Sequence, residues 1–437
     1  MVLCIFIHRK NEEEKEMKKI LSLCMAMALV VSMTACGSKD DGKTTTAAAD
    51  NATTAAAAEN NSEAAGGETT AAAAGETVAF TGEGVFKIGG IGPTTGGASA
   101  YGIAVQRGAQ IAADEINAAG GINGCQVELN FQDDEHDPEK SVNAYNTLKD
   151  WGVQVLVGSV TSNPCIAVAE KTQADNMFQL TPSGTAVDCV KYDNAFRMCF
   201  SDPNQGLESA KYIGENSLAT KVAVIYDSSD PYSVGIYEAF RAEAENQSFE
   251  IVSAEAFTAD SKTDFSVQVQ KAKDAQADLL YMPFYYTEAS LVLQECDKQS
   301  YKPVFFGVDG MDGILSVENF KVELANELMY MAPFVATSED EMVKSFVTKY
   351  ETQFGETPNQ FAADAYDCMY VVKAAIEKAG VTPDMDASAI CDALKTAMTE
   401  ISYDGITGKG ISWEATGEPN KAPMIVQIKD GVTVELQ

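Results

Sequence analysis

The sequence predicts an α/β protein built from two doubly wound lobes. From residue 85 onward, short runs of apolar and β-branched residues alternate with stretches of helical character. These apolar runs are continuous, which is typical of parallel strands covered by helices on both faces. The alternation falls into two consecutive series, separated at Asp202-Pro203. Each series is long enough to form its own sheet, so we expect two doubly wound lobes.

The first 35 residues have the order of a secretory signal peptide. Two lysines precede an apolar stretch at residues 20–31, and small residues then lead into Cys36. A cysteine at the cleavage point is typical of a bacterial lipoprotein signal, although Met33 stands where leucine is usual. We therefore expect lipidation at Cys36. The alternative is a retained membrane helix, but the stretch is shorter than the ~18–20 residues that a spanning helix needs.

Residues 1–16 do not resemble the start of a signal peptide, because they contain an acidic block at 12–16. A second methionine, Met17, directly precedes the lysine pair. We expect synthesis to start at Met17.

The segment 36–84 is predicted to be a disordered tether. It consists mainly of Ala, Thr, Glu, Asn and Gly, with scarcely any large apolar residue. Such a composition buries too little apolar surface to offset the entropy lost on ordering. As a random coil it would span about 35–40 Å on average. A lipid at Cys36 would then hold the folded domain close to a membrane.

The first series contains five predicted strands, at residues 85–92, 125–134, 153–160, 177–183 and 195–200. Helices are predicted between them, including 106–118 and 138–149. Asp137-Pro138 supplies a cap and a first residue for the second of these helices.

The second series also contains five predicted strands, at residues 221–227, 249–257, 277–284, 303–310 and 327–334. The remaining chain offers three helices and two short strands, at 339–354, 359–379, 387–399, 408–413 and 423–429. Ser338 is the expected cap of the first of these helices. These elements are too few for a third domain, so we expect them to complete the two lobes.

Composition excludes several classes of function. The formal charge is −33, and without residues 1–35, which carry five basic and four acidic side chains, it becomes −34. An acidic surface repels nucleic acid and anionic lipid, so we expect no nucleic-acid partner and membrane contact through the lipid anchor only. Beyond His8, the only histidine is His136, so a histidine triad or a multi-histidine zinc site is not expected. We predict no metal, no cofactor and no catalytic residue.

Seven cysteines follow the signal region: Cys125, Cys165, Cys189, Cys199, Cys296, Cys368 and Cys391. None shows the C-x-x-C spacing of a zinc ribbon or redox motif. Disulfides are permitted outside the membrane. The pairing stays open, with Cys165, Cys189 and Cys199 close enough in sequence to be partners.

Several local patterns resemble the branched-chain amino-acid binding proteins of ABC importers. They are IGPTTGGASAYG, QRGAQIAADEINAAGGING, DDEHDP, TPSGTA, DPNQG, IYDSSDPYSVG, VDG and YDGITGKGISWEATGEP, in this order from residue 86 to the C-terminus. The resemblance implies a type I periplasmic-binding-protein fold with solute held between two lobes.

The resemblance also implies how the chain divides. An N-terminal lobe would comprise 86–200 and 335–403, and a C-terminal lobe 203–332 and 407–437. The lobes would be joined by three crossing segments, near 200–203, 332–335 and 402–407. The solute cleft would lie at the carboxyl ends of the strands, where open α/β sheets generally bind ligands.

The resemblance assigns roles to eight residues in binding an amino acid. Hydroxyl and backbone N–H groups would bind its carboxylate, from Ser162, Ser183, Gly184 and Thr185. An acidic side chain would bind its ammonium group, with Glu288 as the first candidate and Asp309 as the second. Aromatic walls would contact its side chain, from Tyr101 and Tyr232. Tyr285 and Phe284 are further candidates, although core packing is the expected role of Phe284.

The function implied is binding without chemistry, by a monomeric, lipid-anchored protein on the outer face of the cytoplasmic membrane. Its partners would be two permease subunits and two ATPases. One alternative is a sensor with the same fold that signals to a receptor. Another is a different solute, such as a short amide, urea or an aromatic acid. A secreted hydrolase is a lesser alternative, since no Gly-x-Ser-x-Gly elbow is present.

Overall fold

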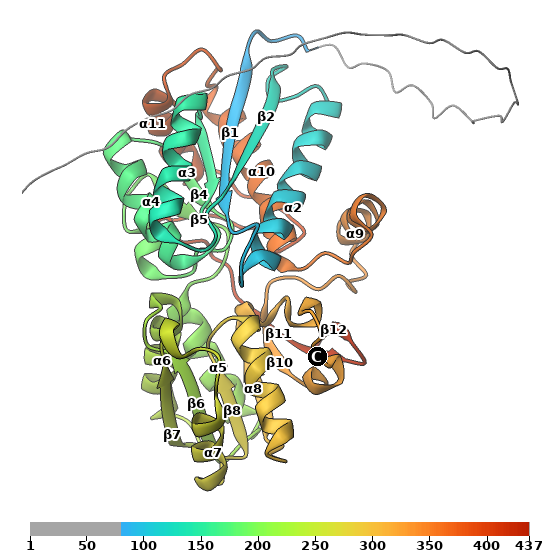
Figure 1. The fold of residues 1–437 in the computed structure, drawn as a ribbon. Coiled ribbons are helices and arrows are strands. Elements are labelled where there is room, and N and C mark those ends of the chain that lie inside the picture. The colour runs from blue at the N-terminus through green and yellow to red at the C-terminus, as the bar shows by residue number, and fades with distance from the viewer. Residues whose placement is uncertain (1–79, 437) are drawn as a thin grey trace, which may run out of the picture. The chain divides into compact units, whose positions relative to one another are not determined.

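Two β-sheets organise the chain (Figure 1). The computed structural model describes residues 80–436, so the predicted signal peptide, the lipidation site Cys36 and residues 36–79 of the tether lie outside the described residues. One sheet has five strands in the order β2-β1-β3-β4-β5, and the other has seven in the order β12-β11-β10-β9-β8-β6-β7. Helices separate most successive strands, which confirms the predicted α/β class.

The first sheet is wholly parallel. Its strands are β1 (Val85–Gly92), β2 (Gln126–Asp133), β3 (Val155–Gly158), β4 (Gln179–Thr181) and β5 (Ala195–Arg197). All five lie within the predicted ranges. The order 2-1-3-4-5 is that of a doubly wound sheet, in which ligands bind beyond the carboxyl ends of the strands.

Helices cover both faces of this sheet (Figure 1). They are α2 (Ser99–Ala118) and α10 (Gln360–Ala379) on one face, and α3 (Pro138–Trp151) and α4 (Ser162–Asp175) on the other. In β1, Ile88 packs under α2 while Ile91 packs under α3, as the alternation of side chains along a strand requires. The prediction started α2 at residue 106. The helix begins two turns earlier because its first turns also carry buried apolar residues, Ala104 in the main core and Tyr101 against Phe361 of α10.

The second sheet is parallel from β6 to β10 and then turns antiparallel. Its strands are β6 (Lys221–Asp227), β7 (Glu250–Phe257), β8 (Leu279–Met282), β9 (Val304–Gly307), β10 (Met329–Ala332), β11 (Met424–Lys429) and β12 (Val432–Glu435). The last strand was not predicted from the sequence. It closes a hairpin with β11 at the edge of the sheet.

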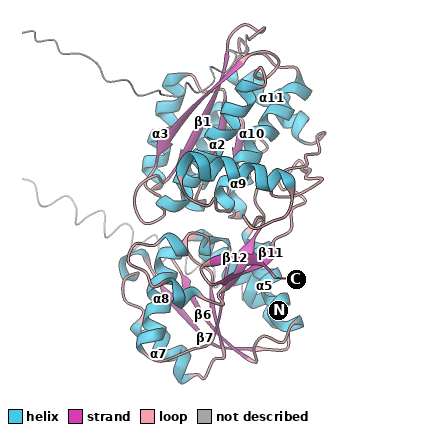
Figure 2. Ribbon diagram, turned by 90° about the vertical axis from the view of Figure 1, so that its right-hand side faces the viewer, coloured by secondary structure: helices cyan, strands magenta, loops and turns pink. Residues whose placement is uncertain are grey.

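Helices again cover both faces of the second sheet (Figure 2). They are α5 (Asp202–Glu215) and α6 (Pro231–Ala244) on one face, and α7 (Ser266–Asp274) and α8 (Tyr286–Lys298) on the other. The C-terminal helices α9 (Glu341–Phe354) and α11 (Ala387–Met398) join α10 near the first sheet, while β11 and β12 join the second. We propose that the chain crosses between the lobes at the three segments predicted above.

The predicted strand at 408–413 is wrong. This region contains only isolated bridges, between Tyr403 and Ile411 and between Trp413 and Pro419. Gly410 has a φ of +63°, which interrupts an extended backbone. The polar and glycine-rich sequence here builds a loop instead.

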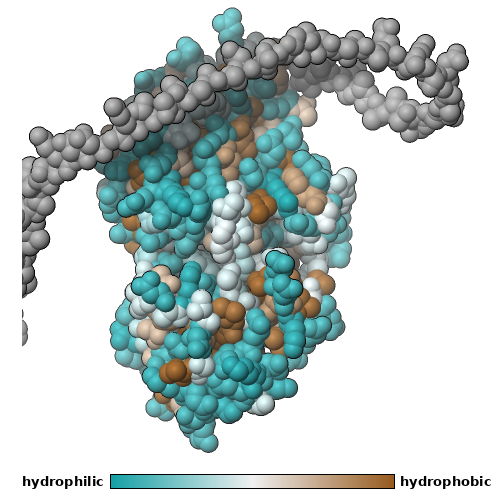
Figure 3. All heavy atoms as spheres, viewed as in Figure 1, coloured by the Kyte–Doolittle hydropathy of each residue, from teal (hydrophilic) through white to brown (hydrophobic). Residues whose placement is uncertain are grey.

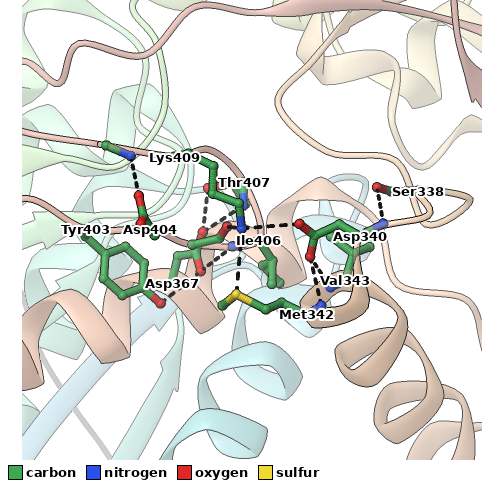
Figure 4. Close-up of polar contacts among 12 residues, drawn as sticks. Ser338, Asp340, Met342, Val343, Asp367, Tyr403, Asp404, Ile406, Thr407 and Lys409 are labelled. Carbon is green, nitrogen blue, oxygen red and sulfur yellow. Dashed lines mark hydrogen bonds and ion pairs between the residues drawn. The ribbon is translucent and has the colours of Figure 1, made fainter.

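Asp367 of α10 fixes the loop that follows α11 (Figure 4). Its two carboxyl oxygens accept hydrogen bonds from the backbone N–H groups of Ile406, at 3.1 Å, and Thr407, at 2.9 Å. The Thr407 hydroxyl donates a third bond at 2.6 Å, and the Tyr403 hydroxyl a fourth at 3.3 Å. One buried carboxyl group therefore holds the segment predicted as the third crossing.

The cap of α9 is Asp340 rather than Ser338, as Figure 4 shows. The Asp340 carboxylate accepts from the backbone N–H groups of Met342 and Val343, at 2.8 and 3.3 Å. Ser338 instead accepts from the Asp340 backbone N–H at 3.3 Å. A cap must precede the first helical turn directly, and the helix starts two residues later than predicted. Lys409 lies 3.4 Å from the Asp340 carboxylate.

Helices α2 and α10 approach each other closely at Gly108. An ideal Cβ at this position would lie 2.0 Å from the backbone oxygen of Ala362. Both residues are buried in the main core. Only a residue without a side chain permits this separation between the two helices.

We predict that Gly108→Ala destabilises the protein by about 2 kcal/mol, because the helices must move apart and core packing is lost. In an unobstructed helix, replacing glycine by alanine would instead stabilise the protein by up to about 1 kcal/mol. The free energy of unfolding in urea measures it. Gly97→Ala is the control, since the nearest atom to its added Cβ is the Thr287 hydroxyl oxygen at 4.0 Å. A Gly108→Ala protein as stable as Gly97→Ala would contradict this account of the helix contact.

Candidate functional site

A small cavity lies where loops from the carboxyl ends of both sheets meet. Its volume is about 10 Å³, room for roughly one water molecule. Six of the eight predicted binding residues line it. The lining consists of Tyr101, Val160, Thr161, Ser162, Ser183, Thr185, Tyr232, Tyr285, Asp309, Gly310 and Phe361. The two predicted residues outside this lining are Gly184 and Glu288.

The hydroxyl side of the cavity comes from the loops after β3 and β4. Ser162, the first residue of α4, accepts a hydrogen bond from the Ala186 backbone N–H at 3.2 Å and lies 3.4 Å from the Thr185 hydroxyl. Ser183 donates to the Val160 carbonyl at 2.7 Å. These contacts join the two loops and place Ser162 and Thr185 side by side at the cavity.

The start of α4 has no side-chain cap. Thr161 occupies the N-cap position but makes no capping hydrogen bond, because its hydroxyl lies 2.8 Å from Nδ1 of His136. Burial lowers the pKa of His136 to about 4, so this histidine is neutral at pH 7. The first N–H groups of the helix are consequently left without a side-chain acceptor. Together with the helix dipole, they favour an anion at this position.

Gly184 has a packing role in this structure. Its N–H donates to the Thr181 hydroxyl at 2.8 Å, and its carbonyl accepts from Arg197 at 2.9 Å. An added Cβ would meet the Thr181 hydroxyl oxygen at 2.8 Å and the Cys165 sulfur at 2.9 Å. Both backbone groups are thus already paired within the protein, and the residue is outside the cavity lining.

Asp309 is the carboxylic acid that lines the cavity. It lies in a short 3-10 helix, η3 (Asp309–Met311), directly after β9, and only 4% of its surface is exposed. Its carboxyl group accepts from the Tyr232 hydroxyl at 2.5 Å. Burial raises the pKa of Asp309 to about 6, although the hydrogen bonds from Tyr232 and other donors act in the opposite direction. The group therefore titrates near neutral pH.

Glu288 forms an ion pair and does not line the cavity. It lies in the first turn of α8 and is nearly buried. Its carboxylate pairs with Nζ of Lys262 at 3.1 Å, and the Lys262 side chain is 44% exposed. The sequence favoured Glu288 over Asp309, but the structure brings only Asp309 into the cavity lining.

Aromatic rings form the remaining walls. The Tyr101 hydroxyl donates to the Gly310 carbonyl at 2.6 Å, which links α2 of the first lobe to the loop after β9 of the second. Tyr232 and Tyr285 stack with ring centroids 4.7 Å apart. Tyr285 also meets Tyr101 and His136 edge to face, at 5.6 and 5.4 Å.

Phe284 packs in the core with Phe257 and Phe265, as expected. Sequence reasoning missed four residues that line the cavity, Val160, Thr161, Gly310 and Phe361, and His136 beside it. Phe361 enters from the first turn of α10 and lies 4.3 Å from the Tyr101 ring. Thr161 and His136 form the contact that leaves α4 uncapped. The only signal for them was position: His136 and Thr161 both follow predicted strands, and Phe361 follows the cap Asn359.

Asp202, the residue that marks the junction of the two series, is fully buried next to this site. Its backbone N–H donates to the Thr185 carbonyl at 2.9 Å, and neither of its carboxyl oxygens has a hydrogen-bond partner in the described structure. Burial raises the pKa of Asp202 well above its ordinary value. A buried carboxylate without a partner is unfavourable in its charged form, which is the physical cause of this shift.

A larger groove of about 950 Å³ lies elsewhere, between α2, α9 and the loops around β10 to β12. None of the eight predicted binding residues lines it. Its walls are a mixture of apolar and polar side chains, and neither the start of α4 nor the stacked pair Tyr232 and Tyr285 contributes to its lining.

The described residues show neither a membrane-spanning helix nor a metal cluster. Among residues 80–436, every helix is too short or too polar to cross a bilayer. Within the same part of the chain, no three His, Cys, Asp or Glu side chains come together in a way that could hold a metal ion. The face of the molecule in Figure 3 is mostly hydrophilic, with small apolar groups scattered among polar surroundings.

Similarity to known proteins extends over the whole folded region. The chain is 32% identical over 335 residues to the Leu/Ile/Val-binding protein BraC3 of Rhizobium johnstonii, a match that covers 74% of this chain and 88% of the relative. Two solved structures have the same fold. The branched-chain amino acid transporter substrate binding protein LivJ of Streptococcus pneumoniae, in complex with isoleucine, superimposes with a TM-score of 0.73 at 29% identity, covering 81% of this chain and 100% of that one.

The leucine binding protein LivK of Thermotoga maritima superimposes with a TM-score of 0.72 at 25% identity, covering 80% of this chain and 98% of that one. These neighbours confirm the predicted type I periplasmic-binding-protein fold. The model of the periplasmic binding protein family matches residues 85–432. The chain therefore belongs to the periplasmic binding protein family.

Proposed function

We propose that this protein is the solute-binding component of an ABC importer and that it binds a free branched-chain amino acid in the small cavity between its lobes. Its relatives include a Leu/Ile/Val-binding protein and a transporter substrate-binding protein in complex with isoleucine. The cavity offers separate environments for an anion, a cation and an apolar group. The protein binds and releases the solute without chemical change.

The uncapped start of α4 is the observation that carries this proposal. A carboxylate placed beside Ser162 and Thr185 would accept from their hydroxyls and from the first N–H groups of α4. It would supply the acceptor that Thr161 withholds by contacting His136. An anionic group is thus the natural occupant of this side of the cavity.

We assign the ammonium group of the ligand to Asp309. This carboxyl group is buried in the cavity lining and is poised to ionise near pH 6. A cation next to it would favour the ionised form. Glu288 already has a cationic partner in Lys262. We therefore propose it as the second candidate for binding the ammonium group, at the edge of the site.

The apolar side chain of the ligand would lie against the rings of Tyr101, Tyr232, Tyr285 and Phe361. Each ring is held by its neighbours or by hydrogen bonds, so the walls are rigid. Rigid aromatic walls select by shape, and aliphatic groups suit their apolar faces.

Binding requires the lobes to part. The cavity of about 10 Å³ is far smaller than any amino acid, and the Tyr101–Gly310 hydrogen bond joins the two lobes across it. Ligand contacts to both lobes would favour the closed arrangement once the ligand has entered. A permease that recognises this closed form would receive the solute.

The location follows from the family and from the N-terminal sequence. Periplasmic binding proteins act outside the cytoplasm, and we place this chain there. We further propose that lipid on Cys36 anchors a monomer to the outer face of the cytoplasmic membrane, where permease and ATPase subunits are its partners.

We predict that leucine, isoleucine or valine stabilises the purified protein. At 100 times its dissociation constant, a ligand adds about 2.7 kcal/mol to the free energy of unfolding. A thermal-shift panel of the twenty amino acids, short amides and benzoate measures this and ranks the solutes. A shift with an amide or benzoate alone would overturn the choice of an amino acid. A bound leucine found in the larger groove would overturn the site.

We predict that Asp309→Asn weakens leucine binding by at least a hundredfold, because removing the partner of a buried cation costs about 3–5 kcal/mol. Glu288→Gln should weaken it by less than tenfold. Isothermal titration calorimetry measures both. Glu295→Gln, also on α8 but paired with exposed Lys298, is the matched control and should bind as the wild type does. A larger loss of leucine affinity in Glu288→Gln than in Asp309→Asn would instead assign the ammonium group to Glu288, as the sequence predicted.

Asp309 should also give two opposite dependences on pH. Its raised pKa means that the unliganded fold gains stability from this group below about pH 4 and loses it as pH rises through 6. Binding of an ammonium group requires the ionised form, so the Kd for leucine should rise about tenfold from pH 7 to pH 5. Urea unfolding and calorimetry across this range measure the two trends. In Asp309→Asn the pH dependence of leucine binding should flatten. Its stability should fall less steeply with pH but not flatten, because burial also raises the pKa of Asp134, Asp230, Asp312 and Asp364 to about 6. In Glu288→Gln both trends should persist.

A further inference from the structure

Two buried thiols meet behind the hydroxyl side of the cavity. An ideal Cβ on Gly184 would lie 2.9 Å from the Cys165 sulfur and 3.1 Å from the Cys189 sulfur, so the two sulfurs are at most 6.0 Å apart. Cys165, Cys189 and Ala186 form a small apolar cluster of their own, separate from the larger cores. Both cysteines are completely buried.

The two thiols interact with each other. The neighbouring Cys189 thiol lowers the pKa of Cys165, while burial raises the pKa of Cys189. The Cys189 sulfur also lies 3.6 Å from the Ser162 carbonyl oxygen, its acceptor in the described structure. Cys199, the third cysteine that the sequence offered for pairing, is not part of this cluster, and its electrostatic neighbours include Asp364 and Cys368.

The two cysteines belong to the two segments that line the hydroxyl side of the cavity. Cys165 is one turn after Ser162 on α4. Cys189 is four residues after Thr185, in the short 3-10 helix η1 (Val187–Val190). In the described structure these segments are joined by non-covalent contacts, chiefly those of Ser162 with Ala186 and Thr185.

We propose that Cys165 and Cys189 form a disulfide in the extracytoplasmic protein and that this bond locks the start of α4 to the loop that carries Thr185. Forming it breaks two S–H bonds and makes one S–S bond. The two electrons and two protons pass to a disulfide-class oxidant, which is reduced to two thiols through a mixed disulfide with one of the cysteines. Such oxidants act outside the cytoplasm.

Burial sets when the bond forms and how long it lasts. A sulfur without solvent access cannot be attacked in the folded protein, so exchange takes place during folding or local opening. Once formed, the bond is shielded from reductants in the same way. The pair therefore acts as a structural lock made at export rather than as a surface redox sensor.

The second part of the inference rests on the proposed function. The lock holds Ser162 and Thr185 at a fixed separation, so the protein does not have to order them when a carboxylate binds. We expect the reduced protein to bind leucine about fivefold more weakly than the oxidised one, at the low end of coupling between two sites. The first part, the disulfide itself, stands independently of any ligand.

The test of the bond is peptide mapping of the full-length protein without reduction, after refolding with oxidised glutathione. We expect a peptide that joins Cys165 to Cys189, with a mass about 2 Da below the sum of its two thiol forms. Among the seven described cysteines, five thiols should remain. Two free thiols at Cys165 and Cys189, or a bond from either to Cys199, would overturn the proposal.

Variants separate the lock from simple packing. Cys165→Ala, Cys189→Ala and the double variant should each melt several degrees lower than the oxidised wild type, but the double variant should be no less stable than either single one. All three should melt at the same temperature with and without reductant, whereas the wild type should melt lower with it. Cys296→Ala, at an equally buried cysteine that contacts neither thiol, should keep the wild-type response to reductant.

Leucine titrations with and without reductant complete the test. A mapped disulfide with an unchanged Kd would overturn the second part alone. A mapped disulfide in a protein that binds no amino acid would leave the lock in place and overturn the proposed function instead.

Discussion

The organisation of the site depends on one hydrogen bond that is directed away from a helix. Thr161 stands where a threonine normally caps the first turn, yet its hydroxyl contacts His136 on the neighbouring loop. The start of α4 is thereby left with unpaired N–H groups at the point where two parallel strands end. The Ser162 hydroxyl lies beside this positive end, where it accepts from the Ala186 backbone N–H and contacts the Thr185 hydroxyl. Asp309 lies among the residues lining the same cavity.

Two carboxyl groups near the cavity lie in apolar surroundings. Asp202 and Asp309 are almost wholly buried near the cavity, and burial raises the pKa of each. Isolated buried charges are unfavourable, so such groups either stay protonated or meet a cation. In Lys421 and Asp364, whose charged atoms lie 2.7 Å apart, the protein supplies that cation itself. At Asp309 no basic side chain does so among the described residues, which leaves the position open to a ligand.

Much of the fold was predictable because it follows from the hydrophobic pattern. The continuous apolar runs predicted every strand of the first sheet and all but the last strand of the second. The early start of α2 was missed because its first turns are rich in small residues, and their burial is decided by the sheet beneath. The predicted strand at 408–413 is absent because Gly410 has a left-handed backbone conformation, and only isolated bridges form there.

The site was predictable in part. Six of the eight residues assigned by resemblance line one cavity, since strand ends and loops fix their positions. The sequence could not show that Glu288 pairs with Lys262, because the two residues are 26 positions apart and on different elements. Nor could it show that both backbone groups of Gly184 are used internally. Such competition for partners depends on side-chain geometry, which local patterns do not encode.

The carboxyl group of Asp367 has a consequence for the way the molecule moves. Its oxygens accept hydrogen bonds from two successive amides and one hydroxyl of residues 406–407. These bonds fix this segment to α10. We propose that the chain crosses between the lobes here. Opening would then be a rotation with its axis near Asp367, in which the outer edges of the lobes move furthest and the atoms next to Asp367 move least.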